Sequence, residues 1–188
     1  MSEIEEALRV LGEGGVVACP TETLVGLLAD ATRGDAVEAV LRAKGRSPGH
    51  TVALLVPSFE AAASLAELSA AAEALARAHW PGPLTLVARA KGELHPALLM
   101  DGKVALRVPG PSLAQTLVAR FGRPLTATSA NPTGAPAVAS TSALDPRVRA
   151  AVDFVLEGES PGGPPSTFVD VSVEPPRVLR EGAIVLDL

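Results

Sequence analysis

Residues 124–136 have the sequence PLTATSANPTGAP, in which a short apolar strand turns into a polar loop. Leu125 and Ala127 alternate with threonines, which is the period of a strand that buries one face. Hydroxyl and amide side chains follow, and Pro132 and Gly134 mark a loop. In open α/β sheets, loops beyond the carboxyl ends of strands bind ligands. The stretch therefore predicts a strand end in an α/β sheet, whose loop either holds a phosphate or forms a simple turn.

The composition predicts one globular domain. The chain has 188 residues, of which 47% are hydrophobic, so it is long enough to bury a core. No apolar run approaches the roughly 18 residues that cross a membrane. The first ten residues, MSEIEEALRV, are acidic and periodic, unlike a signal peptide. We therefore expect a single domain over residues 1–188, located in the cytoplasm, with no membrane partner.

Charge and motif content exclude several classes of function. The net charge is −5, with 13 Arg and three Lys, which is unfavourable for non-specific nucleic-acid binding. The single cysteine, Cys19, excludes an internal disulfide, and the three His lack the spacing of metal ligands, so we expect no metal site in the protein. The chain has no GxxxxGK[ST] and no GxSxG motif, which excludes a P-loop and a hydrolase nucleophile elbow.

Helical and strand patterns alternate along the chain and predict a mixed α/β sheet. Ser2 and Glu5 predict a capping box for a first helix ending at Gly12, and Asp35 and Glu38 predict a second box. Further helices are predicted at 58–80 (in two pieces), 111–122 and 142–152. Strands are predicted at 15–20, 51–56, 82–90, 103–109, 124–129, 153–158, 166–171, 177–182 and 183–188.

Polar residues interrupt these elements near their ends. Lys44 and Arg46 end a helix, where cations are favourable in any case, so they are either ligand groups or helix-end charges. Arg107 lies inside the strand VALRVP and should face an anion or an acidic side chain. Ser129 and Asn131 are either ligand groups or ordinary turn residues.

Four more polar positions belong to the same inventory. Thr21 and Thr23 follow a proline and are alternatively an N-cap of the next element, while Ser166 and Arg180 flank the last strands. Together these side chains are hydrogen-bond donors and cations with no evident nucleophile. Such a set favours binding of phosphates and carboxylates, with catalysis by positioning and charge neutralisation.

Seven motifs in order resemble the YrdC family, the threonylcarbamoyl-AMP synthases of tRNA modification. They are PTETLVGLLADA (20–31), KGR (44–46), PGPLTLV (81–87), VALRVP (104–109), TATSANPTGAP (126–136), STFVDV (166–171) and VLREGAI (178–184). The resemblance runs over nearly the whole chain and is to the short bacterial form, without the extra C-terminal domain of longer relatives.

This resemblance implies a fold, a reaction and partners. The implied fold is a twisted mixed parallel/antiparallel sheet flanked by helices, with a concave, positively charged cavity. The implied reaction joins L-threonine, bicarbonate or CO2, and ATP with Mg2+, giving threonylcarbamoyl-AMP and pyrophosphate. The product would pass to downstream tRNA threonylcarbamoyl-transfer proteins, which form N6-threonylcarbamoyladenosine.

The resemblance also implies a role for each matching residue. The catalytic groups that grip the nucleotide phosphates would be Lys44, Arg46, Ser129 and Asn131, with Arg180 also reaching the nucleotide. Threonine would be held by Thr21, Arg107 and Ser166, with the carboxylate in the Arg107 fork.

Departures from the family pattern include Val25 and Leu28, and two other interpretations stay open. Val25 stands where the family commonly has Tyr, and Leu28 replaces a usual small residue, which alters the expected threonine pocket. One alternative is a module that binds tRNA or double-stranded RNA, although aromatic residues for base stacking make up only 3% of the chain. The other is a paralogue of the same fold that has lost threonine activity.

Overall fold

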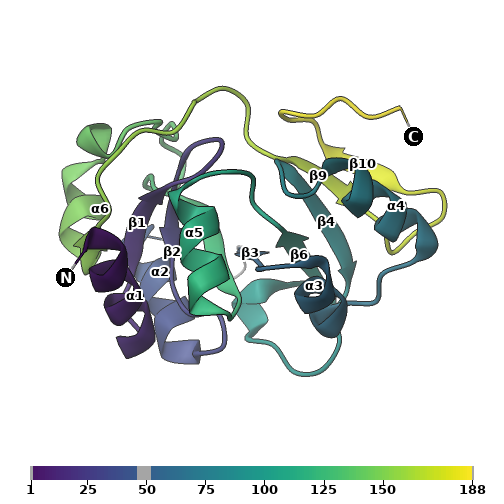
Figure 1. Cartoon of the computed structure of the whole chain (residues 1–188), viewed down its shortest axis with the longest axis horizontal. Helices are drawn as coiled ribbons and strands as arrows, with labels where there is room; N and C mark the ends of the chain where they lie inside the picture. The colour runs from purple at the N-terminus through teal and green to yellow at the C-terminus, as the bar shows by residue number, and fades with distance from the viewer. Residues whose placement is uncertain (1, 46–51, 188) are drawn as a thin grey trace.

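A computed structural model describes residues 2–45 and 52–187 and contains one mixed sheet with helices on both faces (Figure 1). Its strands are β1 (Val17–Pro20), β2 (Val25–Leu28), β3 (Ala53–Leu55), β4 (Leu84–Arg89), β5 (Leu99–Met100), β6 (Lys103–Arg107), β7 (Leu125–Ser129), β8 (Phe154–Val155), β9 (Thr167–Asp170) and β10 (Arg177–Arg180). The order across the ten-stranded sheet is β10-β9-β4-β6-β3-β7-β2-β1-β8, and β5 pairs with β6 off this path. The predicted fold class is confirmed, since β1–β8, β3–β6 and β4–β9 are parallel and the other pairs antiparallel.

The helices divide over the two faces of the sheet. They are α1 (Glu3–Glu13), α2 (Gly34–Ala43), α3 (Phe59–Leu65), α4 (Ala70–His79), α5 (Leu113–Phe121) and α6 (Pro146–Ala151), with 3-10 turns η1 (Pro96–Leu98) and η2 (Thr141–Ala143). On one face, α1 and α5 bury the side of β1, β2 and β7 in one apolar cluster. On the other face, α2 and α6 cover β1 and β2, while α3 and α4 cover β4 and β6.

Strand alternation leaves part of one face uncovered. In β6, Val104 and Leu106 pack into the core beneath α3 and α4, whereas Ala105 and Arg107 point to the opposite face. In β4, Leu86 packs into the same core while Thr85 points away from it. Because α1 and α5 cover the opposite face over β1, β2, β7 and Leu55 of β3, a hollow remains above β6, β4 and β9.

The helix ends agree only in part with the sequence predictions. The capping box of Ser2 and Glu5 is confirmed, but α1 runs past Gly12 to Glu13, and its C-cap is Gly14, which has φ 90°. The second box is wrong, because Arg33 is the N-cap of α2 and makes no side-chain cap. Asp35 instead bonds to the guanidinium of Arg33 beside it.

The segment 183–188, predicted as a strand, is not one over its described residues 183–187. Ile184 exchanges hydrogen bonds with the Oγ1 of Thr167, at 3.0 and 2.6 Å, instead of joining a backbone ladder. Ala183 N–H donates to Pro165 O at 2.8 Å. The segment therefore crosses the start of β9 and holds the chain in place next to Ser166.

Within the part of the chain that the structure describes, no helix is long and apolar enough to cross a membrane.

An ion pair links β6 to β9 across β4. Lys103 Nζ lies 2.7 Å from Asp170 Oδ2, and the Asp170 side chain is only 4% exposed. Burial alone would raise the pKa of Asp170, but hydrogen bonds from Lys103 and Ser172 outweigh it and hold the pKa below the ordinary value. A carboxyl with a lowered folded-state pKa stabilises the fold above its unfolded pKa. That contribution is lost as the pH falls through the folded-state value.

The substitution Lys103→Met is therefore expected to lower the free energy of unfolding at pH 7 by about 1–3 kcal/mol, because the carboxylate loses its counter-ion. The difference from wild type should shrink at a pH acidic enough to protonate Asp170, below its lowered folded-state pKa. Urea unfolding at both pH values measures it, with the exposed Lys91→Met as control. A deficit that is equal at both pH values would contradict the ion-pair account.

Candidate active site

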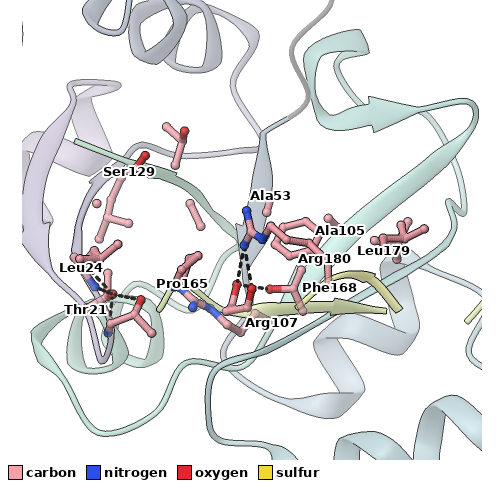
Figure 2. A pocket seen from close by; sticks show the side chains of 18 of the residues that line it. Thr21, Leu24, Ala53, Ala105, Arg107, Ser129, Pro165, Phe168, Leu179 and Arg180 are labelled. Carbon is pink, nitrogen blue, oxygen red and sulfur yellow. Dashed lines mark hydrogen bonds between the residues drawn. The ribbon is translucent and has the colours of Figure 1, made fainter. Parts of the chain in front are cut away.

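The uncovered face of the sheet holds a cavity of about 540 Å³ (Figure 2). Strands β2 and β7 form one wall, and β6, β4, β9 and β10 form the other. The predicted site residues that line it are Thr21, Arg107, Ser129, Ser166 and Arg180. Residues from the whole length of the chain thus meet in one hollow because the strand order interleaves early and late segments.

The side chain of Thr21 organises the turn between β1 and β2. Its Oγ1 accepts hydrogen bonds from the backbone N–H groups of Thr23 and Leu24, at 3.1 and 3.3 Å, and donates to Leu24 O at 2.7 Å. This is the local side-chain turn that Thr forms in loops, so the N-cap alternative for Thr21 is wrong. The turn also fixes the direction of Glu22 between the two threonines.

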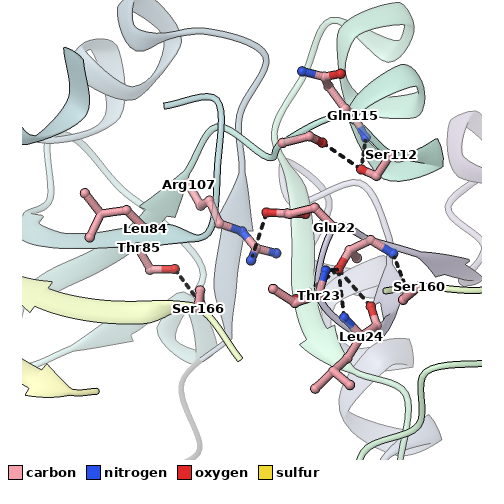
Figure 3. Close-up of polar contacts among 12 residues, drawn as sticks. Glu22, Thr23, Leu24, Leu84, Thr85, Arg107, Ser112, Gln115, Ser160 and Ser166 are labelled. Carbon is pink, nitrogen blue, oxygen red and sulfur yellow. Dashed lines mark hydrogen bonds and ion pairs between the residues drawn. The ribbon is translucent and has the colours of Figure 1, made fainter. Parts of the chain in front are cut away.

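Arg107 faces an acidic side chain, as the sequence predicted for an Arg inside an apolar strand. Its Nη1 lies 3.2 Å from Glu22 Oε1, and the two side chains are 8% and 9% exposed (Figure 3). The contact is an ion pair without hydrogen-bond geometry, because both Glu22 oxygens lack a hydrogen-bond partner in the described structure. Burial lowers the pKa of Arg107, and the charge of Glu22 opposes that shift.

Ser166 and Arg180 form a second polar group on the same wall. The hydroxyls of Ser166 and Thr85 are 2.9 Å apart, and Arg180 Nη2 donates to Ser166 O at 2.7 Å. The guanidinium of Arg180 stacks on Phe168, 4.3 Å from its ring centre. Partial burial and then the charge of Arg107 lower the pKa of Arg180, so two cations share this wall.

Lys44, Ser129 and Asn131 meet at the opposite wall. Lys44 is the C-cap of α2, and its Nζ reaches Ser129 O at 2.5 Å, Ser129 Oγ at 3.4 Å and Asn131 Oδ1 at 3.3 Å. The loop is closed further because the N–H of Thr133 donates to Lys44 O at 3.1 Å. Ser129 lines the cavity, whereas Lys44 and Asn131 lie buried directly behind it. Arg46, the fourth predicted member of this group, lies outside the described residues.

Other candidate groups contribute little chemistry. Cys19 is fully buried, and burial raises the pKa of its thiol, so it is an unreactive core residue as predicted. Residues 2–45 and 52–187 contain no group of three His, Cys, Asp or Glu side chains arranged to hold a metal ion. The cavity thus combines cations and hydroxyl donors, which is suited to a ligand that carries anionic groups at two ends.

Sequence reasoning missed Glu22 and Thr85. Thr85 lies in the apolar strand LTLV, just as Arg107 lies in the apolar strand LRV. A polar residue inside an apolar strand could therefore have identified Thr85 as a candidate site residue. Glu22 lies in the motif PTETLVGLLADA, but its role could not be predicted locally, because its partner Arg107 lies 85 residues further along the chain.

A comparison with protein-family models matches residues 9–182 to the model Sua5_yciO_yrdC, described as telomere recombination. The threonylcarbamoyl-AMP synthase of Pyrococcus abyssi is 36% identical over 98% of this chain and 55% of that protein, so this chain spans about half its length. The threonylcarbamoyl-AMP synthase of Vibrio campbellii is 31% identical over 97% of this chain and all of that protein.

Solved structures show the same fold. The crystal structure of P. abyssi Sua5 complexed with L-threonine superposes with a TM-score of 0.87 at 34% identity, over 97% of this chain and 55% of that one. The crystal structure of Escherichia coli YciO superposes with a TM-score of 0.82 at 26% identity, over 96% of this chain and 89% of that one.

Proposed function

Because this chain belongs to the Sua5/YciO/YrdC family, we propose that it is a threonylcarbamoyl-AMP synthase. The proposed reaction uses L-threonine, bicarbonate or CO2, and ATP, and gives threonylcarbamoyl-AMP and pyrophosphate. The observation that carries the proposal is the pairing of two polar walls in one cavity. One wall offers the guanidinium groups of Arg107 and Arg180, and the other offers the Lys44, Ser129 and Asn131 group.

The Arg107 wall is the proposed site for threonine. A guanidinium fork matches the geometry of a carboxylate, Ser166 supplies a hydroxyl group, and Thr21 lines the same hollow. The α-carboxylate would bind to Arg107, with the amino group directed toward the centre of the cavity. This orientation presents the amine, after it has gained CO2 as a carbamate, to a nucleotide on the opposite wall.

The wall formed by Ser129 is the proposed site for the nucleotide phosphates, with Lys44, Asn131 and Arg46 as the further members of the group. The carbamate oxygen attacks the α-phosphorus of ATP, a new P–O bond forms, and the bond to the β-phosphate oxygen breaks to release pyrophosphate. The protein supplies position and positive charge, so the reaction requires no nucleophile from the chain. Mg2+ would enter with ATP, held by the phosphates, as is common for this ion.

The partners follow from the product. Threonylcarbamoyl-AMP is a mixed anhydride, so a downstream tRNA threonylcarbamoyl-transfer protein would consume it where tRNA is modified, in the cytoplasm. The alternative of a direct tRNA or double-stranded RNA-binding module has no specific feature of the cavity in its favour and becomes an outcome of the test below.

The test is pyrophosphate release by the wild-type protein with ATP, Mg2+ and bicarbonate. Release is expected only when L-threonine is present, and omission of bicarbonate should reduce it. Release that does not depend on threonine would indicate another acceptor and favour the paralogue with an altered pocket around Val25. No release, together with tight tRNA binding, would contradict the enzyme and favour the RNA-binding module.

A further inference from the structure

Glu22 is a buried carboxylate that no proposed role yet uses. Its side chain is 9% exposed, and neither oxygen has a hydrogen-bond partner in the described structure. Burying a charge in this way is unfavourable unless another charge compensates it. Arg107, 3.2 Å away, supplies that charge, so the carboxylate and the guanidinium depend on each other.

The backbone around Glu22 is shaped to hold this side chain. A Cβ atom added to Gly110 would lie 3.2 Å from Glu22 Cγ and 3.4 Å from the Cα of Gly82. Two glycines therefore leave room for Glu22 between closely spaced segments. On its other side, the turn made by Thr21 fixes where the side chain starts.

Glu22 contacts Arg107 from outside the cavity. Arg107 lines the cavity, whereas Glu22 is not among the residues that line it. Figure 3 shows Glu22 on one side of the guanidinium and Thr85 and Ser166 on the other. One guanidinium nitrogen is engaged by Glu22, and the planar fork has further N–H donors for a ligand in the cavity.

The counter-ion also matters because a second cation is near. The charge of Arg107 acts on Arg180, which lines the same wall. Without Glu22, the two guanidinium groups would repel each other with no compensating negative charge, and Arg107 would gain by turning toward solvent. Loss of Glu22 would also remove a negative charge that repels a ligand carboxylate, but that benefit requires Arg107 to keep its position.

We infer that Glu22 is a positioning residue that holds Arg107 in place from behind and so sets the affinity of the cavity for the carboxylate of its amino-acid substrate. The inference rests on the proposed function in taking that substrate to be L-threonine. It assigns Glu22 no contact with threonine and no part in proton transfer.

The variant Glu22→Gln keeps the volume and removes the charge. Its KM for L-threonine in pyrophosphate release is expected to rise by about tenfold or more, because a buried charge pair has lost one partner. The KM for ATP and kcat should stay within about threefold of wild type, since the lost interaction serves ground-state binding. The exposed Glu93→Gln is the matched control and should not change either constant. A threonine KM that is unchanged or lower in Glu22→Gln would overturn the inference.

A double-variant test separates positioning from a general structural effect. In an Arg107→Ala background, Glu22→Gln is expected not to lower kcat/KM for threonine any further, because the residue through which it acts is gone. The same factor in both backgrounds would show that Glu22 acts independently of Arg107 and would overturn the inference.

Two further measurements cover poor folding and an incorrect substrate. If Glu22→Gln does not fold, Gly110→Ala displaces the same side chain without removing a charge and should raise the threonine KM while sparing the ATP KM. An unchanged threonine KM in that variant would overturn the inference.

If the wild type releases no pyrophosphate with threonine, the proposed function fails, and crystal structures of the variants then test the role of Glu22 by the position of Arg107. An Arg107 that keeps its position in Glu22→Gln, or in Gly110→Ala if only that variant folds, would overturn the inference whatever the reaction.

Discussion

The variant Arg107→Ala is expected to lose threonine-dependent pyrophosphate release, with kcat/KM for threonine reduced about a hundredfold or more. Arg107 is the buried cation of the cavity wall that faces the proposed threonine site, and alanine leaves the substrate carboxylate without a charged partner. The rate is measured at several threonine concentrations with saturating ATP. The exposed Arg177→Ala, from strand β10, is the matched control.

Stability must be measured alongside, because Arg107→Ala leaves Glu22 as an uncompensated buried carboxylate, at a cost of about 3–5 kcal/mol. Arg107→Lys keeps the charge but lacks the planar fork, so it should fold well and still bind threonine about tenfold more weakly. A folded Arg107→Lys or Arg107→Ala protein with wild-type threonine kinetics would exclude Arg107 from the threonine site.

The variant Lys44→Met is expected to reduce kcat by about 100-fold to 1,000-fold, which is the usual effect of removing one preorganised charge or donor next to a transferred group. Its ammonium contacts Ser129 and Asn131 at the proposed phosphate wall, so the loss should appear in ATP kinetics and leave threonine binding nearly unchanged. Calorimetric titration with ATP and with threonine separates the two effects.

Lys91→Met is the control for Lys44→Met, since Lys91 is an exposed lysine whose side chain bonds only to Ala63 O among the described contacts. A thermal melt is needed because the substitution also leaves Ser129 O and Asn131 Oδ1 without this donor, at a cost of about 1–3 kcal/mol. A folded Lys44→Met protein with kcat within about threefold of wild type would remove Lys44 from the catalytic group.

Local patterns predicted the elements of this fold well because they depend on near neighbours in sequence. The break between α3 and α4, the end of α5 at Gly122 and the strand that precedes Ser129 all follow from periodicity and turn residues. The strand β2 was not recognised, since its four residues are buried on both faces and show no alternation. The predicted strand at 183–188 was wrong, because residues 183 and 184 bond to Pro165 and Thr167 rather than to the backbone of a neighbouring strand.

The site itself was predictable as a set of residues but not as an arrangement. An Arg inside an apolar strand had to find an anion, yet only the strand order shows that the anion is Glu22. Lys44 marks a helix end in the sequence, but its side chain turns inward to Ser129 because the β7 loop folds against it. Which strands pair, and so which side chains meet, is decided by long-range packing that a single sequence does not reveal.

The location of β9 and β10 at one end of the sheet has a consequence for the protein on the ribosome. The chain emerges from its N-terminus at about 5–20 residues per second, so α1, α5 and the Ser129 wall are available before the last strands. Ser166 and Arg180, which complete the opposite wall, leave the exit tunnel after these elements. A nascent chain therefore cannot enclose its substrates, and ligand binding can stabilise the protein only once β9 and β10 have emerged.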